Sequence, residues 1–118
     1  MTMIKAVDPQ DWINFMADFS ARNRGRRARF EIFGRHGEIS EERQEGYFQK
    51  ISVNEQTVTV LRTYENHARE ETMTDNIANI RGISVQYDTD LSEDMLELTA
   101  TNGNLTALHF ESLVDGDS

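Results

Sequence analysis

The fold is decided by one stretch of the chain, residues 12–33, which reads WINFMADFSARNRGRRARFEIF. In its first half, large apolar residues recur at the spacing of one helical face: Trp12, Phe15, Met16 and Phe19. Just upstream, Asp8 and Pro9 form a helix-start signal, because a carboxylate accepts from the first free backbone N–H groups and proline suits the first turn. We therefore expect a helix that ends near residues 23–25 and whose apolar stripe anchors a core.

From Arg27 to Phe33 the period changes to two, which predicts a strand with one apolar and one charged side. Residues 34–37 read as a turn. We expect the polar stretch from Ile39 to Glu45 to return beside this strand as a charged edge strand, with its glutamates facing the arginines.

The runs at residues 47–53 and 57–64 are separated by the length of a hairpin loop. Matching apolar with apolar and polar with polar side chains gives one register and a four-residue loop, residues 54–57. The expected cross-strand pairs are Val53 with Val58, Ile51 with Val60, Gln49 with Arg62, and Tyr47 with Tyr64.

The chain closes on a second hairpin around the turn dipeptide Asn102-Gly103. A two-residue turn would place Leu98 opposite Ala107. A three-residue loop with Gly103 in the left-handed conformation gathers the large apolar side chains on one face, so we expect this register. It pairs Leu98 with Thr106 and Leu96 with Leu108.

Together these elements predict an α+β fold in a single domain, residues 1–118. The N-terminal helix packs on a mostly antiparallel sheet of six to seven strands, which can curl into a half-barrel. Another strand is expected at residues 83–87, and a short helix within residues 65–81, because so long a loop is uncommon in a compact domain. We expect residues 114–118 to be a frayed tail.

This order of elements resembles a family of short uncharacterised bacterial domains of unknown function. The resemblance extends loosely over most of the chain and includes the arginine-rich strand. It implies the order of elements and assigns no catalytic residue. The other matching positions are Trp12, Phe15, Phe19 and Ser20 in the helix, and Gly103, Leu105, Leu108 and Phe110 in the closing hairpin.

Composition limits the compartment and the partners. The 118 residues include no cysteine, which removes disulfides, thiolate metal sites and cysteine nucleophiles and fits a reducing compartment. No apolar run reaches the roughly 20 residues that span a bilayer, and no export signal is visible, so we expect a cytoplasmic protein without a membrane partner. The formal net charge of −9 disfavours binding to nucleic acid.

No residue cluster typical of an enzyme or a metal site stands out, and we expect no cofactor. His36, His67 and His109 lack metal-ligand spacing, although His67 and Glu71 would form half a site on a helix. An acidic run can supply paired carboxylates for acid–base catalysis, but we interpret it as a solvated strand edge that discourages aggregation. It comprises Glu38, Glu41, Glu42 and Glu45.

The most distinctive feature is a set of five arginines within eight residues of an acidic chain, beginning at Arg22. Guanidinium groups grip phosphate or carboxylate with two parallel hydrogen bonds. The candidate contacts to a partner or an anion are Arg24, Arg26, Arg27 and Arg29. The alternative, which the sequence favours, is that these arginines neutralise acids of the same domain, namely Glu41, Glu42 and Glu45.

These features favour a non-catalytic binding or protein–protein interaction module, which can self-associate through the arginine stretch of one copy and the acidic surface of another. A second hypothesis is an acidic inhibitor or immunity-type protein that mimics nucleic acid. A third is a small ligand-binding half-barrel or enzyme with a pocket lined by Tyr47, Arg62 and Tyr64. Direct nucleic-acid binding ranks last, because the arginines lack interleaved aromatic residues.

Overall fold

The computed structural model describes residues 3–42 and 46–111, which form one short α-helix and nine β-strands. The α+β class is confirmed, with more strands than the expected six to seven. In chain order the elements are β1 (Met3–Ala6), the 3₁₀ helix η1 (Pro9–Asp11), α1 (Trp12–Asn23), β2 (Arg27–Phe33), β3 (Ile39–Glu41), β4 (Gly46–Asn54), β5 (Thr57–Asn66), β6 (Arg69–Ile77), β7 (Ile80–Tyr87), β8 (Glu93–Ala100) and β9 (Leu105–Phe110). The expected tail, residues 114–118, lies outside the described residues.

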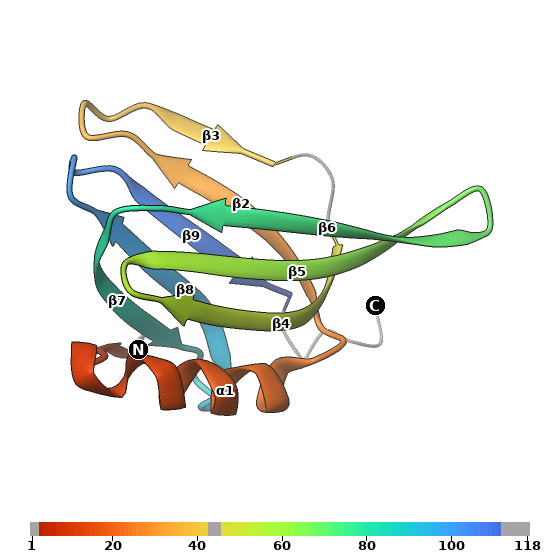
Figure 1. The fold of residues 1–118 in the computed structure, drawn as a ribbon, viewed down its shortest axis with the longest axis horizontal. Coiled ribbons are helices and arrows are strands. Elements are labelled where there is room, and N and C mark those ends of the chain that lie inside the picture. The colour runs from red at the N-terminus through yellow and green to blue at the C-terminus, as the bar shows by residue number, and fades with distance from the viewer. Residues whose placement is uncertain (1–2, 43–45, 112–118) are drawn as a thin grey trace.

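All paired strands are antiparallel, in the order β1-β7-β8-β9-β2-β4-β5-β6, and β3 pairs with β2 off this path. In Figure 1, β4, β5 and β6 lie in front of the layer formed by β2, β7, β8 and β9, and α1 runs along the bottom of both. The sheet is not closed into a barrel. The apolar core therefore lies between the layers and above the helix.

The N-terminal helix forms as its periodicity predicts. The Asp8 carboxylate accepts from the Gln10 N–H at 3.1 Å, and the α-helix ends at Asn23, before Gly25 with its φ of +92°. Phe19 is fully buried and packs its ring against those of two other core phenylalanines, Phe48 and Phe110, with centroids 5.8 and 5.6 Å away. Within the described ranges, no helix has the length and apolar character needed to cross a membrane.

The β4–β5 hairpin follows the expected register only near its turn. Val53 pairs with Val58 and Ile51 with Val60, but a bulge between Phe48 and Lys50 then shifts the ladder. The expected pairs of Gln49 with Arg62 and Tyr47 with Tyr64 are therefore wrong; Phe48 lies opposite Arg62, and Tyr47 opposite Thr63. The bulge places Phe48 in the core, where it is fully buried. Strict alternation from Ile51 would turn this side chain outward. The loop is also shorter than expected, since Asn54 already pairs with Thr57.

The closing hairpin adopts the three-residue loop. Leu98 lies opposite Thr106 and Leu96 opposite Leu108, and Gly103 has a φ of +94°. Leu96, Leu98 and Leu108 are fully buried, so the register is the one that places the large apolar residues in the core.

Residues 65–81 contain no helix, which corrects the expectation for this segment. They complete β5, form all of β6 and begin β7. The turn between β5 and β6 is at His67 and Ala68, both with positive φ, so the two strands pair directly over their length. β1 was also not predicted. It is a short strand, residues 3–6, which is exposed and pairs with β7.

Candidate functional site

Two of the candidate arginines, Arg24 and Arg26, lie in the turn after α1 and contact the backbone of the same domain. Arg24 Nε donates to the Gln49 carbonyl at 3.4 Å. Arg26 donates to the carbonyls of Glu93 at 2.6 Å and Glu111 at 2.7 Å, and its guanidinium lies 4.9 Å from the centre of the Phe110 ring. Arg26 therefore ties the helix–strand turn to β8 and to the end of β9.

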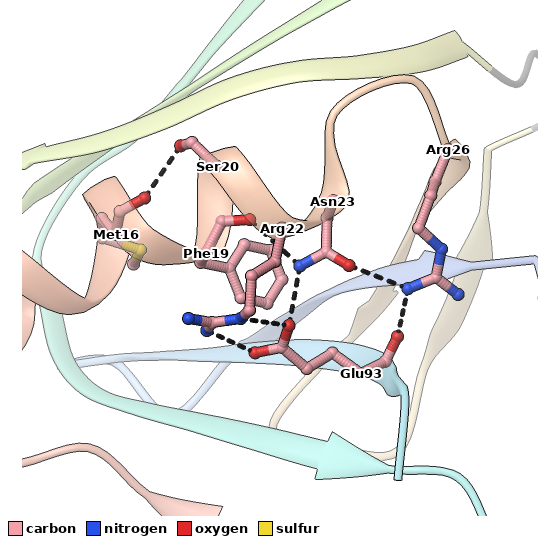
Figure 2. Close-up of polar contacts among 7 residues, drawn as sticks. All are labelled: Met16, Phe19, Ser20, Arg22, Asn23, Arg26 and Glu93. Carbon is pink, nitrogen blue, oxygen red and sulfur yellow. Dashed lines mark hydrogen bonds and ion pairs between the residues drawn. The ribbon is translucent and has the colours of Figure 1, made fainter. Parts of the chain in front are cut away.

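The end of α1 is fixed by the side chain of Glu93, which is buried at the start of β8. Figure 2 shows its carboxylate accepting from Arg22 Nε at 3.0 Å, from Arg22 Nη2 at 2.7 Å and from Asn23 Nδ2 at 2.8 Å. The Asn23 oxygen accepts in turn from Arg26 at 2.9 Å. The carboxylate raises the pKa of Arg22. This network clamps the helix to the sheet and uses two cations of the arginine stretch.

The other two candidates, Arg27 and Arg29, lie on β2, alternating with the buried residues Ala28 and Phe30. Arg27 pairs with Glu111 at 3.6 Å, and Arg29 pairs with Glu41 of β3 at 2.9 Å. The structure therefore separates Arg27 and Arg29 on the strand from Arg24 and Arg26 in the turn. Of the acids expected to neutralise the arginines, Glu41 contacts Arg29, Glu42 contacts Arg62 instead, and Glu45 lies outside the described residues.

Arg62 is the largest fully buried side chain. It forms two bonds with the Glu42 carboxylate, at 2.7 and 2.9 Å, and one with Asp75 at 3.3 Å. Its guanidinium also donates to the Ala28 carbonyl at 3.1 Å and lies 4.6 Å from the centre of the Phe30 ring. The Arg62 guanidinium therefore connects its own strand, β5, to β2, to β6 and to the end of β3.

The ion pair holds both of its main partners in their charged forms. Burial has the largest influence on Glu42 and acts to raise its pKa, but bonds from Arg62 and the Phe30 N–H, with the charge of Arg62, leave the pKa of Glu42 below its ordinary value. Burial likewise acts to lower the pKa of Arg62, and the bonds and charges of Glu42 and Asp75 leave that pKa raised. At neutral pH the pair is therefore fully ionised.

A groove of about 330 Å³, which we call the acidic groove, opens between β2–β3 on one side and β6 on the other. Three of its lining residues are apolar: Phe30, Ile32 and Ile77. The polar lining consists of Ser40, Glu41, Glu42, Asp75, Asn76 and Thr106. The Glu41, Glu42 and Asp75 side chains are 53%, 28% and 43% exposed, and all three are paired within the domain, Glu41 with Arg29 and the other two with Arg62. The groove can receive an aliphatic group beside a cation.

β6 borders the acidic groove and has one free edge, since in the described part of the chain it pairs with β5 alone. In Figure 1 the β5–β6 hairpin also projects well beyond the rest of the molecule. His67 and Ala68 form a two-residue turn with positive φ, in which the flanking residues Asn66 and Arg69 are the first pair of the hydrogen-bonded type, and bonded and non-bonded pairs alternate from there. The backbone N–H and C=O groups directed away from β5 are therefore those of Glu70, Thr72, Thr74 and Asn76.

The tyrosines of the pocket hypothesis lie elsewhere. Neither Tyr47 nor Tyr64 lines the acidic groove, and Arg62 is buried beside it. The Tyr64 hydroxyl donates to Glu71 at 3.2 Å, which raises the pKa of Tyr64. The β4 bulge explains part of this difference, because it directs Phe48 rather than its neighbour Tyr47 into the core.

The histidines do not assemble a metal site. Residues 3–42 and 46–111 contain no group of three or more His, Cys, Asp or Glu side chains suited to a metal ion. His67 occupies the β5–β6 turn and Glu71 lies on β6, so the helical spacing that would join them is lost. His109 on β9 lies 3.9 Å from Glu31 and 3.7 Å from Asp94.

Sequence reasoning missed the roles of Arg62 and Glu93. A signal for Arg62 was present, because it continues the alternation of the buried Val58 and Val60 and therefore faces the core. Glu93 carries no such signal, since its partners Arg22 and Asn23 are about seventy residues away in the chain. No family model, curated protein or solved structure matches this chain.

Proposed function

We propose that this chain is a non-catalytic interaction module that binds a basic protein partner at the acidic groove. The observation that carries the proposal is the groove itself, where three partly exposed acidic side chains, which outnumber their two arginine partners Arg29 and Arg62, lie beside three apolar side chains. A cation with an adjoining aliphatic group on a partner would gain both ion pairing and apolar burial there.

The contacts of the arginine stretch also favour a basic partner. Arg22, Arg27 and Arg29 pair with the carboxylates of Glu93, Glu111 and Glu41, whereas Arg26 donates to the main-chain carbonyls of Glu93 and Glu111. The three paired cations compensate acids of their own domain, while the chain keeps a formal net charge of −9. We therefore favour a basic partner over an anionic one, and over self-association through the arginines. Electrostatic attraction of this kind accelerates encounter and weakens as salt screens it.

The test is isolation of the chain from its own source cells at about 0.05 M and about 0.5 M salt, where the Debye length falls severalfold. We expect a stoichiometric basic protein that stays bound at low salt and is released at high salt. Binding is then reconstituted from the two purified proteins by calorimetry.

Two charge reversals of the purified chain locate the contact. Glu41→Lys at the groove and Glu111→Lys near the other end of β2 change the net charge equally, and both replaced acids are about half exposed and paired with arginine. We expect only Glu41→Lys to weaken binding, by about fivefold or more at low salt. A chain that migrates alone at low salt, or that carries only a small bound molecule in native mass spectra, would overturn the proposal.

A further inference from the structure

The free edge of β6 adds a binding mode to the proposed function, on which this inference rests. We infer that the partner supplies an extended segment that pairs with β6 as an additional strand and directs alternate side chains into the acidic groove. Such strand addition gains affinity from main-chain hydrogen bonds and specificity from pockets for alternate side chains.

The backbone of β6 is arranged for this pairing. Thr72, Thr74 and Asn76 direct their N–H and C=O groups away from β5, and these residues are exposed. An edge of nine residues is long for an unprotected strand, because edge strands are ordinarily kept short, bulged or covered. The β5–β6 ladder runs without a register shift, so the edge is regular along its length.

The side chains of β6 that line the acidic groove specify the partner's sequence. Asp75 and Ile77 are two residues apart and therefore project from the same face of the strand. Asp75 is associated with Glu42 through Arg62, whereas Ile77 shares the groove with Phe30 and Ile32. An added strand would match them with a lysine or arginine and a large apolar residue, also two positions apart.

The net charge of β6 disfavours pairing with a second copy of itself. An antiparallel self-pairing centred on Met73 would place Glu71 opposite Asp75 twice, and like charges directly opposite each other destabilise a sheet. The strand carries three acids against the single Arg69. Charge complementarity therefore favours a basic segment from a different protein.

The experiment uses a phage-displayed library of random linear 12-residue peptides, selected against the full chain at low salt. We expect selected peptides to carry a basic and an apolar residue two positions apart. Their synthetic forms should slow amide hydrogen exchange at Thr72, Thr74 and Asn76, as measured by NMR.

Thr74→Pro tests the backbone contact, because proline removes an N–H that does not bond to β5 and is tolerated at such edge positions. Thr74→Ala is the matched control, since it removes the side chain and keeps the N–H. We expect the proline variant to weaken peptide binding about tenfold or more and the alanine variant to leave it within about twofold. If the proline variant does not fold, Ile32→Asp, compared with Glu111→Lys, tests the groove instead.

The outcomes separate this inference from the proposed function. Peptides that bind and are weakened by Glu41→Lys, but that protect no β6 amide and tolerate Thr74→Pro, would overturn strand addition and leave a groove-binding module. A selection that yields no binding peptide, or only peptides equally sensitive to Glu41→Lys and Glu111→Lys, would overturn both.

Discussion

At the scale of single residues, stability depends on how buried charges are compensated. Arg62 is fully buried, and its Nε has no hydrogen-bond partner among the described residues. Burying a charge is costly unless close partners replace its hydration. Here Glu42, Asp75 and the Ala28 carbonyl supply that replacement. The Arg62–Glu42 pair therefore matters to the fold mainly because the buried Arg62 cation is not stable there without a carboxylate.

Glu42→Ala should destabilise the protein by about 3–5 kcal/mol, because it leaves the Arg62 cation buried with only the Ala28 carbonyl and the weaker contact to Asp75. Adding Arg62→Met, which replaces the cation by an apolar chain, should recover most of the loss. The measurement is urea unfolding of the wild type, both single variants and the double variant. A double variant as unstable as the sum of the two singles would contradict this account.

Residue identity alone predicts part of this arrangement. The inward position of Arg62 follows from its alternation with Val58 and Val60, and its need for an acid follows from burial. Which acid it contacts does not follow, because Glu42 and Asp75 lie 20 and 13 residues away on other elements. The expected partners of the arginines were nearby glutamates, and for Arg29 that expectation matches the observed contact with Glu41.

At the scale of elements, local patterns predicted the helix and the closing hairpin because each buries its own apolar residues. β6 gave no such signal. Among its nine residues, only Met73 and Ile77 are large and apolar. With so few apolar residues, no period distinguishes a polar strand from a polar helix in the sequence. The β4 bulge was also unpredictable from alternation, since it is the step that breaks alternation.

The start of β4 depends on a residue without a side chain. A Cβ atom at Gly46 would lie 2.8 Å from the end of Met73, 3.1 Å from Arg62 Cβ and 3.2 Å from the Thr63 carbonyl oxygen. Met73 can move, but the Thr63 backbone is held in the β5–β6 ladder. Gly46 therefore lets β4 begin close against β5.

Gly46→Ala should lower the free energy of unfolding by about 1–3 kcal/mol through overpacking at this contact. Gly82→Ala is the matched control, because a Cβ there meets only Thr99 Cβ at an ordinary 3.8 Å, and its effect should stay within about 0.5 kcal/mol. Both values come from the same chemical denaturation series. Equal effects of the two substitutions would show that strand propensity, rather than the close approach at Gly46, controls stability.

At the scale of the whole molecule, the two layers of the sheet are held together by apolar packing and by ion pairs that cross between elements. Glu93 joins α1 to β8. Arg62 joins β5, in the front layer, to β2 and to the end of β3. Both links need ionised carboxylates.

Acid stability therefore reports on Glu42. A carboxylate whose pKa is lower in the folded state than in the unfolded state stabilises the fold above its unfolded pKa and loses that contribution as pH falls through the folded value. The stability of the wild type relative to Glu42→Gln should thus be constant near neutral pH and shrink below about pH 4.5, the ordinary value for this group. Unfolding in urea at several pH values measures this difference, with Glu111→Gln as an exposed control. A difference that does not change down to about pH 3 would mean that Arg62 does not lower the pKa of Glu42.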